Sequence, residues 1–163
     1  MNKDFRYVTS YIASNTTFLL RSITANGKTH TIIHDKQGKV KFAQKPIKIV
    51  RATCRIHGTT FEAAQKMAKL FFGDNRHKLP IMISIDYGNP CVFFPLFSPH
   101  STSNIWVNLQ SITNIVERGD ETIITLTDMS EEVLPIHYKS FNQQYVRAMM
   151  FYKHLILNRG FHR

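Results

Sequence analysis

Tight-turn signals divide the first quarter of this chain into short runs of β-branched and apolar residues. The runs cover residues 16–23, 29–34 and 39–42, and the dipeptides Asn26-Gly27 and Gln37-Gly38 lie between them. An Asn-Gly pair between two such runs is the strongest short-range signal for a β-hairpin, because both residues tolerate the positive φ of a tight turn. The pattern predicts consecutive hairpins, and it limits the fold to classes that contain an antiparallel sheet.

A second group of short runs follows residue 80. Residues 80–85 and 91–97 are apolar enough to form a buried hairpin around a turn at residues 87–90. Further runs cover residues 105–109, 111–117, 121–128 and 131–136, and Arg118-Gly119-Asp120 is the clearest turn among them. We expect the second half of the chain to be built mainly from antiparallel hairpins.

Three segments have helical features. Residues 46–58 are ambiguous: Ile47-Ile49-Val50 suits a strand, whereas a 3.6-residue apolar repeat that ends at Gly58 favours a helix. A second helix is expected over residues 61–71, after a capping box formed by Thr59 and Glu62. The overall class is therefore α+β, with N-terminal hairpins, two central helices, antiparallel β-hairpins and a C-terminal helix.

The C-terminal helix is expected to start at Ser140 as its N-cap and to carry an apolar stripe with heptad spacing. The favoured interpretation is that this stripe packs on the sheet of its own chain. It is also the best candidate for a homodimer contact, through Tyr145, Met149, Tyr152, Leu155 and Ile156.

The positive charge of this 163-residue chain is confined to its first half. The net charge is +10, and residues 1–80 hold fifteen Lys/Arg and four acids, whereas residues 81–163 hold six bases and seven acids. Residues 36–55 alone contain seven bases and no acid. Such a segment repels itself unless a polyanion meets it, so a nucleic-acid backbone is the expected partner. One domain over residues 1–163 is expected, with a basic lobe at 1–73 and a β-rich lobe at 79–163.

The spacing of the bases suggests how they would meet phosphates. If residues 46–58 are helical, Lys48, Arg51 and Arg55 form one stripe beside the apolar one. The predicted contact set joins the helix, the preceding hairpin and the linker that follows: Lys36, Lys39, Lys41, Lys45, Lys48, Arg51, Arg55, Arg76 and Lys78. Phe94 and Trp106 are expected to be core residues.

Sequence signals for catalysis or metal binding are weak. Phosphate-loop, dinucleotide-binding, nucleophile-elbow and zinc-protease motifs are not found. Cys54 and Cys91 belong to no C-x-x-C pair, and His30 with His34 would give only two ligands on one strand face. We expect neither an enzyme nor a cofactor or metal; a nuclease using Asp35 or Asp86 is the enzyme alternative. The N-terminus has no targeting pattern and the chain has no run long enough to span a bilayer, so a soluble protein is expected.

Several short motifs follow one another over roughly residues 30–158, and their order and approximate spacing are informative. They are Pro46-x-x-Ile49-Val50, Cys54-Arg55, Gly58-Thr59-Thr60-Phe61, His77-Lys78-x-Pro80-Ile81-Met82, Phe93-Phe94-Pro95, Trp106, and Leu134-Pro135-Ile136-x-Tyr138-x-Ser140-Phe141-x-x-Gln144. In the order and approximate spacing of these motifs, the chain resembles the ComK competence transcription factors. The resemblance implies a bacterial, cytoplasmic and nucleoid-associated activator of DNA-uptake genes. It also implies dimers that bind A/T-rich boxes through the minor groove, RNA polymerase as a partner, and an adaptor that directs proteolysis.

Two departures from this family matter. After Phe61 the family usually has a Gly-Arg-Lys-like triplet, whereas this chain reads Glu62-Ala63-Ala64-Gln65-Lys66. The sequence also ends at Arg163, where better-known members continue, so a shortened paralogue is one expectation. A weaker similarity, to the end of LytTR-type domains that insert loops into the major groove, covers residues 106–112 and 134–136. A non-specific nucleoid or RNA-binding protein is the remaining alternative.

Overall fold

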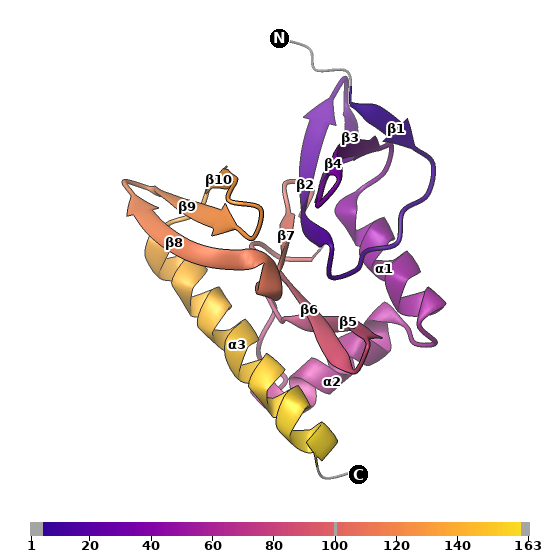
Figure 1. The fold of residues 1–163 in the computed structure, drawn as a ribbon, viewed down its shortest axis with the longest axis vertical. Helices are drawn as coiled ribbons and strands as arrows, with labels where there is room; N and C mark the ends of the chain where they lie inside the picture. The colour runs from indigo at the N-terminus through magenta and orange to yellow at the C-terminus, as the bar shows by residue number, and fades with distance from the viewer. Residues whose placement is uncertain (1–4, 100, 161–163) are drawn as a thin grey trace.

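The computed structural model describes residues 5–99 and 101–160, and it confirms the α+β class (Figure 1). The helices are α1 (Pro46–Ile56), α2 (Phe61–Phe72) and α3 (Tyr138–Gly160), with a 3-10 turn η1 (Leu109–Ser111). The strands are β1 (Arg6–Val8), β2 (Thr17–Ala25), β3 (Lys28–Asp35), β4 (Gly38–Phe42), β5 (Ile81–Asp86), β6 (Asn89–Pro95), β7 (Ile105–Asn108), β8 (Ile112–Arg118), β9 (Glu121–Leu126) and β10 (Glu131–Leu134).

The larger sheet joins the two halves of the sequence. Its strand order is β1-β4-β3-β2-β7-β6-β5, and every neighbouring pair is antiparallel except β1 with β4. At the junction Leu20 of β2 pairs with Trp106 of β7. The two expected lobes therefore contribute strands to one continuous sheet, and their division stays a proposal.

Helices cover both faces of this sheet. Leu20, Phe93 and Trp106 face one core, which α1 and the start of α2 cover. The residues beside them in sequence, such as Leu19 and Phe94, face a second core under α3. This alternation follows from the two-residue period of a strand. Phe94 and Trp106 are both fully buried, as expected.

Helix α1 resolves the ambiguity at residues 46–58 in favour of a helix. Pro46 occupies its first turn, where a missing backbone N–H costs nothing. At the other end the Gly58 amide donates to the Arg55 carbonyl at 3.1 Å and the Thr59 amide to the Cys54 carbonyl at 3.0 Å. With Gly58 at φ +81°, these bonds form a Schellman motif that ends the helix. The apolar stripe of the helix is fully buried at Ile49, Val50 and Cys54.

The expected caps of the other two helices were wrong by one to three residues. The N-cap of α2 is Thr60, whose hydroxyl accepts the Ala63 amide at 3.0 Å, and not Thr59. Helix α3 starts at Tyr138, so Ser140 lies in its first turn; there the His137 Nδ1 accepts the Lys139 amide at 3.3 Å. Its expected apolar stripe does pack on its own chain, since Phe141, Ala148 and Leu155 are buried.

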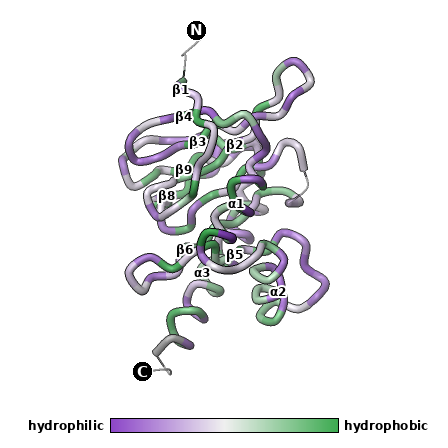
Figure 2. The backbone as a smooth tube through the Cα atoms, turned by 90° about the vertical axis from the view of Figure 1, so that its right-hand side faces the viewer, coloured by the Kyte–Doolittle hydropathy of each residue, from purple (hydrophilic) through white to green (hydrophobic). Residues whose placement is uncertain are grey.

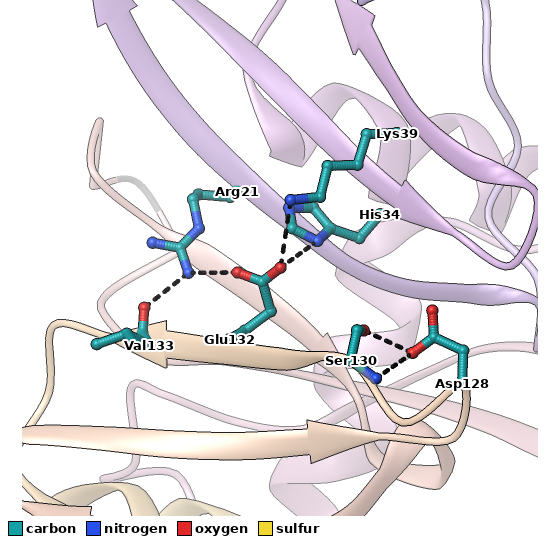
Figure 3. Close-up of polar contacts among 7 residues, drawn as sticks. All are labelled: Arg21, His34, Lys39, Asp128, Ser130, Glu132 and Val133. Atoms are coloured by element: carbon teal, nitrogen blue, oxygen red, sulfur yellow. Dashed lines mark hydrogen bonds and ion pairs between the residues drawn. The ribbon is translucent and has the colours of Figure 1, made fainter. Parts of the chain in front are cut away.

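A smaller sheet, in the order β10-β9-β8, lies against α3. Figure 3 shows how Glu132 of β10 links the smaller sheet to the larger sheet through ion pairs. Glu132 Oε1 is 2.8 Å from His34 Nδ1 and 3.5 Å from Lys39 Nζ, and Arg21 Nη2 is 3.5 Å from Glu132 Oε2. We call Arg21, His34, Lys39 and Glu132 the Glu132 cluster. Over the described residues, none of the helices is both long and apolar enough to cross a bilayer.

Candidate nucleic-acid interface

Three exposed cations lie on one side of α1. Lys45 is its N-cap residue, Lys48 follows one turn later, and Arg55 lies two turns beyond that on the same side. We call Lys45, Lys48 and Arg55 the α1 basic face. None of the three forms an ion pair with another residue in the described part of the chain.

The start of α1 is itself electropositive. No side chain caps it and its first turn contains no acid. The free backbone amides of a helix N-terminus carry a partial positive charge, to which Lys45 and Lys48 add two full charges. An anion such as a phosphate would relieve this repulsion, so the α1 basic face has the electrostatics of a phosphate-binding surface.

Arg51 belongs to the predicted stripe but is engaged within the chain. Its guanidinium forms an ion pair with Glu62 at the start of α2 and lies 4.8 Å from the centre of the Phe61 ring. The hydrogen bond from Arg51 lowers the pKa of Glu62 below its usual value. Arg51 is therefore held against α2, and its charge is paired with a carboxylate.

Two of the three predicted cations on the hairpin face acidic residues. Lys36 and Lys39 line a cleft between the β3–β4 turn and the β9–β10 loop, together with Asp128, Glu131 and Glu132. Lys39 also belongs to the Glu132 cluster (Figure 3). Lys41 lies over the Tyr7 ring, with its Nζ 5.2 Å from the ring centre. Of these three lysines, only Lys36 is both exposed and outside an ion pair or cation–π contact among the described residues.

The cations of the linker between α2 and β5 are exposed and lie elsewhere. Burial lowers the pKa of Arg147 on α3, and the nearby charge of Arg76 lowers it further. Arg76 therefore lies beside α3, which covers the sheet face opposite α1. Lys78 is exposed two residues later. The structure groups Lys45, Lys48 and Arg55, but it does not bring all nine predicted cations onto one face.

The candidate dimer residues on α3 divide into two groups. Leu155 is buried, and Tyr145 and Tyr152 are half-buried against the same core. Met149 and Ile156 are exposed to 45% and 37%. Only these two members of the set present an apolar surface to solvent.

Within residues 5–99 and 101–160, no three His, Cys, Asp or Glu side chains come together as metal ligands would. His34 instead pairs with Glu132. Both cysteines are free and buried, and burial raises the pKa of Cys54 to about 11 and of Cys91 to about 12. Both therefore stay protonated, unreactive thiols at neutral pH.

Sequence reasoning missed the residues that decide which cations are free. The sequence pattern predicts a capping role for Glu62 and predicts no role for Glu132 or Arg147. The departure from the family pattern at Glu62 was the only available signal. Glu132 and Arg147 lie beside residues that are far from them in the sequence. No local sequence pattern could have predicted these contacts.

Comparisons with known proteins agree with the resemblance seen in the sequence. The family described as ComK protein matches residues 8–158. The competence transcription factor of Bacillus subtilis (strain 168) is 27% identical over 140 residues, which cover 85% of this chain and 71% of that protein. No solved structure matches the chain. The family match spans nearly the whole sequence, and the chain belongs to the ComK family.

Proposed function

We propose that this chain is a transcription factor of competence genes that binds double-stranded DNA. The observation that carries the proposal is the α1 basic face, on a family member with a net charge of +10. Its three cations have no carboxylate partner among the described residues, so they are available to phosphates. The similarity to the Bacillus subtilis competence transcription factor supports the choice of DNA and of promoter-specific action.

We further propose that the DNA is A/T-rich and is approached through its minor groove. A-tracts narrow that groove and deepen its negative potential, which attracts Lys and Arg side chains. Base edges in the minor groove distinguish A·T from G·C but little else, so groove width and box spacing would supply the selectivity. A reader of paired boxes needs two copies, and the exposed Met149 and Ile156 on α3 are the proposed homodimer contact.

The DNA target is tested by three affinities measured at one salt concentration. The probes are a duplex with paired A-tract and T-tract boxes, a mixed-sequence duplex, and single-stranded RNA. We expect the first to bind most tightly. Equal affinities would contradict promoter recognition and would favour a non-specific nucleoid or RNA-binding protein.

The surface is tested by charge removal. The triple variant Lys45→Gln, Lys48→Gln, Arg55→Gln should bind DNA more weakly, and each lost phosphate contact should flatten the salt dependence by about 0.9 per protomer. The matched control is Arg118→Gln, Lys139→Gln, Lys153→Gln, which removes three exposed cations elsewhere. If both variants change the salt dependence equally, the α1 basic face is not the interface.

A further inference from the structure

A groove of ≈ 300 Å³ lies beside β5, the last strand of the larger sheet. We call it the β5 groove. Its walls come from the α1–α2 turn, from α2 and from β5. They are lined by His57, Thr59, Ala64, Met67, Met82, Ile83, Ser84 and Ile85.

The lining residues show that the groove follows the edge of the strand. Met82 packs against the core under α3, whereas Ile83 belongs to the core under α1. Consecutive side chains of a strand point to opposite faces, so a groove that touches both faces of β5 must run along its edge. In Figure 2, β5 is seen between α1 and the largely hydrophobic α2. The groove therefore separates a sheet edge from a helix.

The β5 edge has main-chain groups free for pairing. Among the described residues, β5 has β6 as its only strand neighbour. Ile85 lies opposite Pro90 of β6. Facing residues of an antiparallel pair exchange two hydrogen bonds or none, and proline has no N–H, so this pair exchanges none. The N–H and C=O of Ile85 consequently point away from β6, toward the open edge.

The groove also offers contacts for side chains. Met67 and Ile85 are exposed to 41% and 46%, and the neighbouring Ile56 and Leu70 are exposed as well. Apolar walls and a free strand edge together suit an extended polypeptide.

We propose that the β5 groove binds an extended acidic segment of a partner protein, which adds to the sheet as a strand beside β5. Its main chain would pair with Ile85, and its alternate apolar side chains would enter between β5 and α2. This inference does not rest on DNA binding by the α1 basic face.

Charge selects an acidic partner over a second copy of the chain. Arg55 and Lys66 are exposed on the helices beside the groove. Of the nearby acids, Glu62 is paired with Arg51. Asp86 accepts the neutral Asn15 amide at 3.3 Å and has no cationic partner among the described residues, so Arg55 and Lys66 outnumber it. A second copy would bring the same cations and a further net charge of +10. An acidic segment would meet them with opposite charge.

The probe is a fluorescein-labelled synthetic peptide, Glu-Val-Glu-Ile-Glu-Val-Glu, titrated into the full chain and followed by fluorescence anisotropy. Its control replaces the central isoleucine by proline, which keeps the charge but removes an amide donor. We expect the proline peptide to bind more weakly by a factor of up to about ten, the cost of a lost main-chain hydrogen bond. Equal binding of the two peptides would mean charge attraction alone and would overturn the proposal.

The site is located by two further measurements. Met67→Glu should weaken peptide binding, whereas Met150→Glu, the same change at an exposed position on α3, should not. Amide hydrogen exchange at Ile85 should slow when the peptide binds. Protection elsewhere but not at Ile85 would contradict the proposal, as would a Met67→Glu variant that binds normally. Sedimentation would detect self-association through this edge as a mass above that of one chain, which Met67→Glu would lower. Such a result would identify a second copy of the chain as the occupant of the groove and would overturn the proposal.

Discussion

At the scale of single residues, Glu62 controls how much charge α1 can offer. It pairs with Arg51 from the start of α2, directly after Phe61. The Arg51 guanidinium lies over the Phe61 ring as well, so removing the carboxylate would leave it oriented at the surface. The acidic residue therefore weakens the predicted stripe without changing the fold of α1.

Glu62→Gln should strengthen DNA binding, because it releases the charge of Arg51 for a phosphate. The expected change is a steeper salt dependence, by about 0.9 if one phosphate contact is gained. The measurement is affinity for the A-tract duplex over a range of salt concentrations. Glu121→Gln, which removes an exposed carboxylate from β9, is the control for net charge. If the two variants behave alike, Arg51 does not reach DNA.

These residues show where sequence reasoning about the site stops. The bases themselves and the face formed by Lys48 and Arg55 could be predicted, because helical spacing is a local property. Whether a base is free depends on the carboxylate that folding places beside it. Lys39 is neutralised by Glu132 and Arg51 by Glu62, and neither partner follows from the spacing of the bases.

At the scale of elements, the ends of the helices separate what local sequence determines from what it leaves open. Gly58 ends α1 as expected, because only glycine adopts a φ of +81° without strain. The start of α2 is less well determined, since Thr59 and Thr60 are both good N-cap residues. Glu62 would complete a capping box with Thr59, but it pairs with Arg51 instead, and Thr60 caps the helix.

Thr60→Ala should therefore lower the free energy of unfolding by about 1 kcal/mol, the usual cost of losing an N-cap. The Thr59 hydroxyl caps no amide of α2, so Thr59→Ala should cost less. Urea denaturation of the two variants beside the parent protein measures both values. A larger loss for Thr59→Ala would assign the cap to Thr59 and contradict the described geometry.

At the scale of the whole molecule, strand order is the property least visible in the sequence. The hairpins β2–β3, β5–β6 and β8–β9 were predictable, because each is specified by its own turn. The pairing of β2 with β7 joins residues from opposite halves of the chain, and nothing local specifies it. That pairing makes one sheet from two expected lobes.

We therefore propose that residues 1–163 unfold as one cooperative unit. Trp106, the single tryptophan, is fully buried where β2 meets β7, so its fluorescence reports on the junction. Urea unfolding followed by this fluorescence should coincide with unfolding followed by far-UV circular dichroism. Two separated transitions would show that the lobes at residues 1–73 and 79–163 are independent.

The Glu132 cluster should make the contact between the two sheets sensitive to acid. Burial raises the pKa of Glu132, but His34, Lys39 and Arg21 outweigh it and hold this pKa below its usual value. A carboxyl whose pKa is lowered by folding stabilises the protein above its unfolded pKa of about 4.3, and this stabilisation is lost as the pH falls through its folded pKa.

Glu132→Gln should therefore cost about 1 kcal/mol of unfolding free energy near pH 6 and progressively less toward pH 3. Urea denaturation at several pH values measures the difference, with Glu131→Gln, its exposed neighbour, as the control. A difference that does not change with pH would show that the carboxylate charge does not hold the sheets together.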